Sequence, residues 1–274
     1  MANVAPGRPG RKELPWWLVA AVAIAVVVAI VIATSEIYSQ VFNIVLKGVG
    51  ITIFVTIVAF AMASALGLAV ALMALSPSRL LSQSARFYVE IIRGIPILVL
   101  LFWIAFAGVP AFVAGWNFVM APLTKAGLVG ELQVRDVSLL WRAIIALTIA
   151  YSSFIAEIFR AGIQAVDAGQ IEAAKALGLS RYRRFRHVVW PQAFRTILPP
   201  YSNDFVAMVK DSSLVSVLGV ADITQMGKVY AAGSFRFFET YSIVAYIYLI
   251  LTVGLSISLR ALERRLRAQG VPQD

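Results

Sequence analysis

The chain has 274 residues, of which 60% are hydrophobic and only 14% are charged, and its mean hydropathy is +0.83. A soluble domain is about half apolar and about a quarter charged, so the composition excludes an ordinary soluble protein and predicts an all-α integral membrane protein. The net charge of +10 does not require a nucleic-acid partner. The basic residues lie at the ends of apolar segments, where anionic lipid and loop topology explain them better.

The cysteine and histidine content excludes further classes. There is no cysteine, so disulfides and thiol chemistry are excluded. His187 is the single histidine, and alone it does not provide the ligand set of a zinc site. We therefore expect no metal site and no catalytic site.

The first predicted membrane span follows a short tail. Residues 1–15 are basic and rich in Pro and Gly, so we expect a disordered cytoplasmic tail. Residues 16–34 are 19 uncharged, mostly apolar residues, which is long enough to cross a bilayer as an added N-terminal helix. A cleaved signal peptide is the alternative, although this stretch is longer than a usual signal core.

Residues 48–78 are too long for one perpendicular span, so they predict a tilted helix that ends near Pro77. Ala63, Gly67 and Ala71 lie four residues apart. This spacing permits close contact with another helix, although small residues are also common elsewhere in membrane helices.

The next segments predict a connector, a span and an outer loop. Residues 80–93 are expected to be a short polar connector, and residues 94–116 the third span. Pro110 and Gly115 are expected to end or bend this span. Residues 117–137 then form an outer loop without a catalytic arrangement.

The fourth predicted span, residues 138–159, leads into a polar segment. Glu157 and Arg160 are three residues apart and could pair on one helix face. Glu157 could instead contact a neighbouring helix or a partner protein. The segment from 160 to 195, called the polar segment below, contains seven basic residues, namely Arg160, Lys175, Arg181, Arg183, Arg184, Arg186 and Arg195.

Two short helices are predicted inside the polar segment. Asp167 can cap the first, with Gln170 completing a capping box, and Gly178 suits a left-handed residue after it. Ser180 can cap the second, and Pro191 is expected to limit or kink it. One face of the first helix is expected to carry apolar or small residues at helical spacing, namely Ile171, Ala174 and Leu177.

Glu172, Ala173 and Ala174 offer a small-residue surface on which another protein could sit closely. The alternative for the whole polar segment is a solvated basic loop that obeys the positive-inside rule.

The fifth predicted span, residues 196–220, is interrupted by polar groups. Pro199 and Pro200 are expected to break its start. The polar groups are costly if they face lipid, so they are pathway candidates, namely Asn203, Asp204, Lys210 and Asp211. For Lys210 and Asp211 the alternative is a position at the outer interface, where long side chains reach water.

Residues 221–240 are expected to be an outer loop and residues 241–259 the last span, before a basic cytoplasmic tail that includes residues 266–274. This gives about six spans. Lys and Arg concentrate on one side, so both termini are predicted to be cytoplasmic.

Several motifs together resemble one family. Glu172-Ala173-Ala174, followed by Gly178, Val188 and Pro191, resembles the EAA loop of ABC importer permeases. Residues 93–96, 151–160 and 210–220 resemble the polar amino acid uptake permeases, and the resemblance covers about residues 44–265. Val188 and Trp190 stand where isoleucine and leucine are common in that loop.

The resemblance implies a type I importer core of five helices plus an N-terminal helix. It implies that the loop couples the chain to a cytoplasmic ATPase dimer, which carries ATP and Mg²⁺. A second permease, identical or related, and a binding protein that delivers a polar amino acid would complete the assembly in the inner membrane. The chain has no phosphate-binding loop of its own, so it is not expected to be an enzyme.

Two other functions remain open from the residues alone. An ion-gradient-driven secondary amino acid transporter often shows repeated halves and paired broken helices, whereas one broken segment is predicted here. A membrane scaffold would not need polar residues inside the fifth segment. The pathway hypothesis is that Asn203 and Asp204 face the substrate route or a partner subunit.

Overall fold

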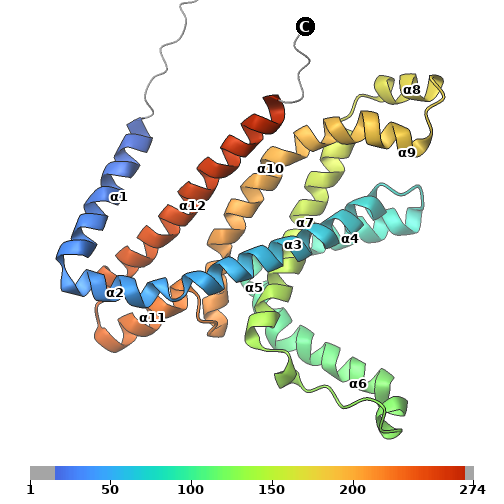
Figure 1. Ribbon diagram of the computed structural model, residues 1–274. Helices are drawn as coiled ribbons and strands as arrows, with labels where there is room; N and C mark the ends of the chain where they lie inside the picture. The colour runs from blue at the N-terminus through green and yellow to red at the C-terminus, as the bar shows by residue number, and fades with distance from the viewer. Residues whose placement is uncertain (1–15, 269–274) are drawn as a thin grey trace, which may run out of the picture.

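The computed structural model describes residues 16–268, which are helical with short connections (Figure 1). The predicted tails therefore lie wholly or largely outside the described residues. The helices are α1 (Trp16–Thr34), α2 (Glu36–Leu46), α3 (Val49–Ala74), α4 (Arg79–Gly94), α5 (Ile97–Trp103), α6 (Val109–Lys125), α7 (Leu139–Gln164), α8 (Ala168–Ala176), α9 (Arg181–Arg184), α10 (Trp190–Asp211), α11 (Ile223–Ser234) and α12 (Phe237–Ala268). Four short turns join them, namely the π-helical η1 (Ile104–Gly108) and η3 (Phe185–Val189) and the 3₁₀ turns η2 (Val134–Asp136) and η4 (Ser212–Leu218).

Within this part of the chain, four helical stretches are long and apolar enough to cross a membrane, namely Glu36–Ala74, Ile97–Lys125, Leu139–Gln164 and Phe237–Leu266. The first predicted span is present as the shorter apolar stretch Val19–Thr34. The fifth predicted span corresponds to α10, whose 22 residues extend about 33 Å. Because α10 contains several polar residues, it is less apolar than the four stretches named above.

The most extensively packed pair of helices is α3 with α7. A Cβ added at Gly67 would lie 2.9 Å from the backbone oxygen of Ser152. Ala63 and Ala71 are fully buried on the same face of α3. The predicted close contact along this small-residue face is therefore confirmed, and only small residues allow these two backbones to approach so closely.

Residues 80–93 are not a connector but the helix α4. Ala85 and Val89 are buried on one face, and the hydroxyls of Tyr88 and Ser152 lie 2.6 Å apart. The prediction failed because polar and charged residues on the other faces hide this apolar stripe in the average composition. α4 runs beside α3, and both pack on α7 (Figure 1).

Pro110 neither ends nor interrupts the third span, which continues to Lys125. The Val109 N–H donates to the Ile104 carbonyl in the π-helical turn η1. Proline has no N–H, so it cannot supply the next bond of that register, to the carbonyl of Ala105. The buried Arg142 guanidinium donates to this oxygen instead, at 3.1 Å.

Arg142 also donates to the carbonyls of Val137 and Val134, at 2.8 and 2.5 Å. It therefore joins α7, η1 and the outer loop through backbone oxygens. A buried charge costs much less free energy when it is fully hydrogen-bonded. No local pattern in the sequence points to this role of Arg142, because its acceptors depend on the tertiary structure.

The predicted break at Pro199 and Pro200 is wrong, because α10 runs continuously through both prolines. Neighbouring helices stabilise the prolines of membrane helices. Here Tyr201 packs against the rings of Phe60 and Phe159, and its hydroxyl lies 2.7 Å from Ser64 Oγ. The interruption comes later, at η4, which ends at Gly219 with a φ of 78°.

The predicted outer loop at residues 221–240 contains the helix α11. Asp222 is fully buried and caps it by accepting the Gln225 N–H at 2.8 Å. The Tyr248 hydroxyl of α12 donates to the same carboxylate at 3.1 Å. These bonds hold α11 against α12 at the opposite end of the molecule from α8.

Candidate functional site

The predicted first helix of the polar segment is α8. Asp167 caps it by accepting the Gln170 N–H at 3.2 Å. Glu172 and Ala173 on this helix are exposed. α8 lies at the end of the molecule where α1 begins and α12 ends (Figure 1), so it presents these residues to whatever surrounds that end.

Only half of the predicted capping box forms. The Gln170 side chain does not return to the backbone of its own helix but accepts a bond from Gln192 Nε2 of α10 at 2.5 Å. The same Gln192 nitrogen donates to the Val188 carbonyl at 3.0 Å. Gln192 thus joins α8 to the start of a long helix. The sequence offered no signal for it, because its partner is 22 positions away.

The predicted apolar face of α8 is only partly correct. Ile171 packs on a buried cluster that contains Val189 of η3 together with Ala193 and Ile197 of α10, and Ala174 is buried. Leu177 is 81% exposed. The prediction that Ala174 shares the exposed surface with Ala173 is therefore wrong. Tyr182 is also exposed, at 75%. Exposed large side chains within a basic segment are a signal by which Leu177 and Tyr182 could have been predicted as candidate contact residues.

The helices beneath α8 approach each other closely. A Cβ added at Gly162 of α7 would lie 2.3 Å from Ile197 Cγ1 of α10. Ala193 is fully buried at the same contact. Small residues therefore set the spacing of α7 and α10 where these helices enter and leave the polar segment.

Gly178 has a φ of 74°, which is the left-handed conformation predicted for it. No atom outside its neighbours lies within 4 Å of an added Cβ. The position therefore constrains the residue through backbone conformation and not through space. Ser180 then caps α9 by accepting the Arg183 N–H at 3.4 Å.

Pro191 lies at the start of α10 and is exposed. It does not end the second helix, because α9 continues through the π-helical turn η3 into α10. A π-helical turn takes up one residue more than an α-helical turn. The proline therefore does not end the helix, and the irregularity in its hydrogen bonding is the π-helical turn η3, which ends two residues before Pro191.

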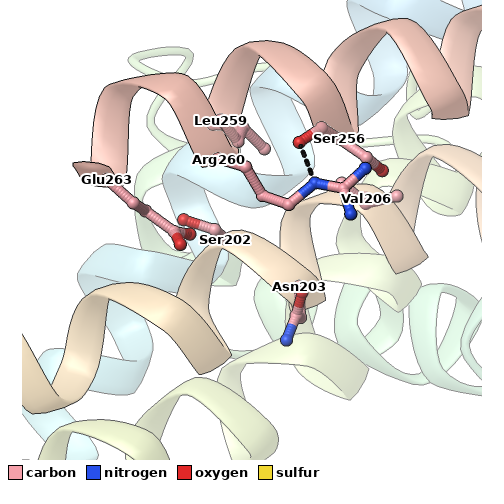
Figure 2. Close-up of a pocket in the computed structure, with 7 residues that line it drawn as sticks. All are labelled: Ser202, Asn203, Val206, Ser256, Leu259, Arg260 and Glu263. Carbon is pink, nitrogen blue, oxygen red and sulfur yellow. Dashed lines mark hydrogen bonds between the residues drawn. The ribbon is translucent and has the colours of Figure 1, made fainter. Parts of the chain in front are cut away.

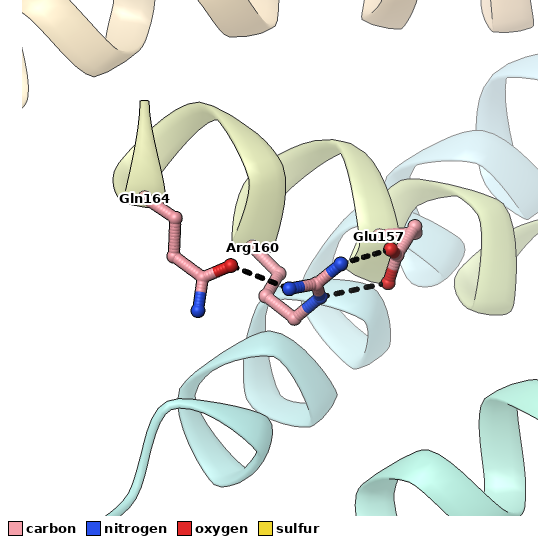
Figure 3. Close-up of polar contacts among 3 residues, drawn as sticks. All are labelled: Glu157, Arg160 and Gln164. Carbon is pink, nitrogen blue, oxygen red and sulfur yellow. Dashed lines mark hydrogen bonds and ion pairs between the residues drawn. The ribbon is translucent and has the colours of Figure 1, made fainter. Parts of the chain in front are cut away.

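Glu157 and Arg160 form the predicted pair, with two contacts between guanidinium and carboxylate (Figure 3). Arg160 Nη1 also donates to Gln164 Oε1 at 2.5 Å. The pair links the last two turns of α7, where the polar segment begins. Its side chains remain about one third exposed, so solvent screens their interaction.

The four polar residues of α10 fall into two faces. Asn203 and Lys210 are exposed, whereas Asp204 and Asp211 are partly buried. Each pair is seven residues apart, which is about two helical turns. Asp211 accepts a bond from the Tyr151 hydroxyl at 2.7 Å, so the structure does not bring all four residues together.

Asp204 Oδ2 is buried and has no hydrogen-bond partner among the described residues. The charge of Arg93 acts on the carboxylates of Asp204 and Glu157. The Arg93 guanidinium lies 5.4 Å from the centre of the Phe154 ring. Arg93 was part of a motif in the sequence, but its position over the Phe154 ring depends on how α4 packs on α7.

Several long apolar helices, together with an exposed polar segment at one end of the molecule and polar residues on α10, are the features of a polytopic membrane transport subunit. Residues 63–268 match the sequence profile of a family described as the binding-protein-dependent transport system inner membrane component. The chain belongs to this family. It is the permease subunit of an ABC importer in the inner membrane, and ATP hydrolysis takes place on a separate subunit. An ion-gradient-driven transporter is thereby set aside.

Individual relatives agree with this assignment. The chain is 34% identical to the probable amino-acid permease protein YxeN of Bacillus subtilis (strain 168), over 72% of this chain and 80% of the relative. It is 38% identical to the glutamine transport system permease protein GlnP of Escherichia coli (strain K12), over 67% and 74%. A crystal structure of an amino acid ABC transporter with histidines superposes with a TM-score of 0.69 at 35% identity, covering 85% of this chain and 99% of that one.

Proposed function

We propose that the chain forms the membrane pathway of an importer for polar amino acids. The amino acids specified for its relatives support this substrate class. A binding-protein-dependent importer works with an ATPase and a binding protein. We further propose an ATPase dimer that carries ATP and Mg²⁺, and a second permease, identical or related, that closes the pathway.

The observation that carries the coupling proposal is the exposed helix α8, which packs against η3 and α9 and is hydrogen-bonded to the start of α10. Glu172 and Ala173 face outward, and Gln170 is tied to α10 through Gln192. An ATPase that displaces α8 would displace α10 with it. Because α10 carries Asp204, movement at the docking surface reaches a candidate pathway residue through one rigid helix.

The pathway proposal rests on Arg93 and Asp204. A zwitterionic amino acid that leaves water needs an anionic partner for its ammonium group and a cationic partner for its carboxylate. The unpartnered Asp204 carboxylate and the Arg93 guanidinium provide one of each. Asn203 lies next to Asp204 on the more exposed face.

The direct test is uptake into proteoliposomes that contain the permease, its ATPase and its binding protein. We expect uptake of L-glutamine, L-arginine or L-histidine to require ATP inside the vesicles and the binding protein outside. Uptake driven by a proton or sodium gradient without ATP would contradict the mechanism. ATP-dependent uptake of another solute class alone would contradict the substrate.

Orientation has its own test, because the chain has no native cysteine. We propose that α8 and both termini face the cytoplasm. A Ser180→Cys variant should react with a membrane-impermeant maleimide only from the cytoplasmic side. A Ser234→Cys variant, at the end of α11, should react only from outside, and the reverse pattern would overturn the proposed topology.

A further inference from the structure

A polar pocket lies between α10 and α12 (Figure 2). Its volume is about 160 Å³, which is below the range of about 300–1,000 Å³ that is usual for drug-sized ligands. Val206 and Leu259 form an apolar wall. Its polar lining comes from both helices and consists of Ser202, Asn203, Ser256, Arg260 and Glu263.

Two opposite charges in this pocket are held apart. Arg260 and Glu263 are three residues apart on α12, a spacing that allows an ion pair. Among the described residues the ion pair that forms is Arg160 with Glu157. Arg260 Nε instead donates to the Ser256 carbonyl at 3.1 Å. Figure 2 shows Arg260 folded back toward Ser256, with Glu263 turned toward Ser202.

The separation leaves a cation and an anion that both line one small cavity. The terminal nitrogens of Arg260 can donate to an oxyanion, and the Glu263 carboxylate can accept from an ammonium group. Ser202, only 5% exposed, and Asn203 add polar groups on the α10 side. A molecule that bridges the two charges therefore carries both signs.

We propose that this pocket binds a small zwitterion, with its oxyanion on Arg260 and its ammonium group on Glu263. Two sources have this chemistry. One is the transported amino acid near the end of its passage, and this source rests on the proposed function. The other is the headgroup of phosphatidylethanolamine, since α12 ends at the proposed cytoplasmic side. The apolar wall at Val206 and Leu259 would accept the aliphatic part of either.

The absence of native cysteines provides a direct binding assay. The probe position is Ser256→Cys in the pocket, and the matched control is Ser258→Cys, which is exposed on the same helix. Both serine hydroxyls donate to the carbonyl four residues earlier, at 2.6 and 2.9 Å. The full chain is placed in phosphatidylglycerol nanodiscs, which supply no ammonium group, and modification by a small methanethiosulfonate reagent is timed.

We expect millimolar L-glutamine or L-arginine to slow modification at Ser256→Cys several-fold and to leave Ser258→Cys unchanged. Adding Arg260→Gln or Glu263→Gln should abolish the protection. Arg264→Gln, one turn further along, should not. N-acetyl-L-glutamine amide, which lacks both charges, should give none.

The lipid source is tested by exchanging phosphatidylglycerol for phosphatidylethanolamine without added amino acid. Slower modification that depends on Arg260 and Glu263 would assign the pocket to the headgroup. If neither amino acid nor lipid protects, or if the uncharged analogue protects equally well, the proposal is wrong. The assay contains no ATPase and no binding protein, so its failure leaves the proposed import function untouched, and a failure of import leaves the protection intact.

Discussion

The α3–α7 core and the polar segment are built in opposite ways. In the core, fully buried small residues such as Ala63 and Ala71 let two backbones approach along several turns. In the polar segment, α8 has one buried residue, Ala174, and depends on a side-chain bond from Gln170 to α10. The core therefore tolerates almost no added side-chain volume, whereas most residues of the polar segment are exposed.

This difference separates two kinds of failure. A change in the core should remove the protein, because the helices no longer fit. A change on the surface of α8 should leave a folded protein in the membrane that no longer couples to its ATPase. Variants in the two regions distinguish these failures.

The largest effect is expected for Gly67→Leu. Its Cβ would lie 2.9 Å from the Ser152 backbone oxygen, and overpacking a close contact costs about 1–3 kcal/mol or more. The yield of monodisperse protein and its melting temperature should both fall. The control is Gly50→Leu on the same helix, because no atom lies within 4 Å of a Cβ added at Gly50. Equal stability of the two variants would show that α3 and α7 do not need this close contact.

Ala173→Trp should strongly impair coupling without affecting insertion. Ala173 is exposed on α8, and a bulky ring there would hold a docked ATPase away. ATP-driven uptake should fall about tenfold or more, since overpacking of a close contact costs 1–3 kcal/mol, while the melting temperature stays unchanged. Ala232→Trp, on the exposed face of α11, should transport normally. Full uptake by Ala173→Trp would contradict the proposal that the ATPase docks on this face of α8.

Asp204→Leu should reduce uptake without reducing the amount of protein in the membrane, because it makes α10 more apolar. The unpartnered carboxylate would no longer be available to the substrate ammonium group. Initial uptake rates at several substrate concentrations measure the effect. Thr196→Leu adds the same side chain to an exposed position of α10 and should remain active. Wild-type rates and an unchanged substrate preference for Asp204→Leu would leave only a structural role.

The smallest effect is expected for Gly178→Ala. A residue with a Cβ pays about 1–2 kcal/mol for the left-handed conformation, and the φ of Gly178 is 74°. One kcal/mol corresponds to a factor of about five, so uptake should fall by about that much. Gly233→Ala, in a helical conformation with free space, should be neutral. A Gly178→Ala variant as active as Gly233→Ala would mean that α8 reaches its docking position without this turn.

Local patterns determined much of the fold. The apolar runs located the spans, and the spacing of Ala63, Gly67 and Ala71 predicted the close face of α3. Asp167, Gly178 and Ser180 each occupy the cap or turn predicted for them. These features could be predicted because each depends on residues within a few positions of one another, and backbone sterics and hydrogen bonding act at that range.

Tertiary structure decided what depends on distant partners. Pro199 and Pro200 sit inside a continuous helix because α10 is packed against α3 and α7, whereas a local rule predicts a break. Pro110 lacks a backbone N–H, and Arg142, which lies 32 positions later in the sequence, supplies the missing hydrogen bond to the Ala105 carbonyl. Gln192 reaches back to Gln170, and Arg93 comes to lie over the Phe154 ring of α7 through the fold of α4. The sequence by itself determined the apolar spans and the polar segment, but it missed the helices α4 and α11. The long-range hydrogen bonds between the segments exist only once the helices pack, because only packing brings their donors and acceptors together.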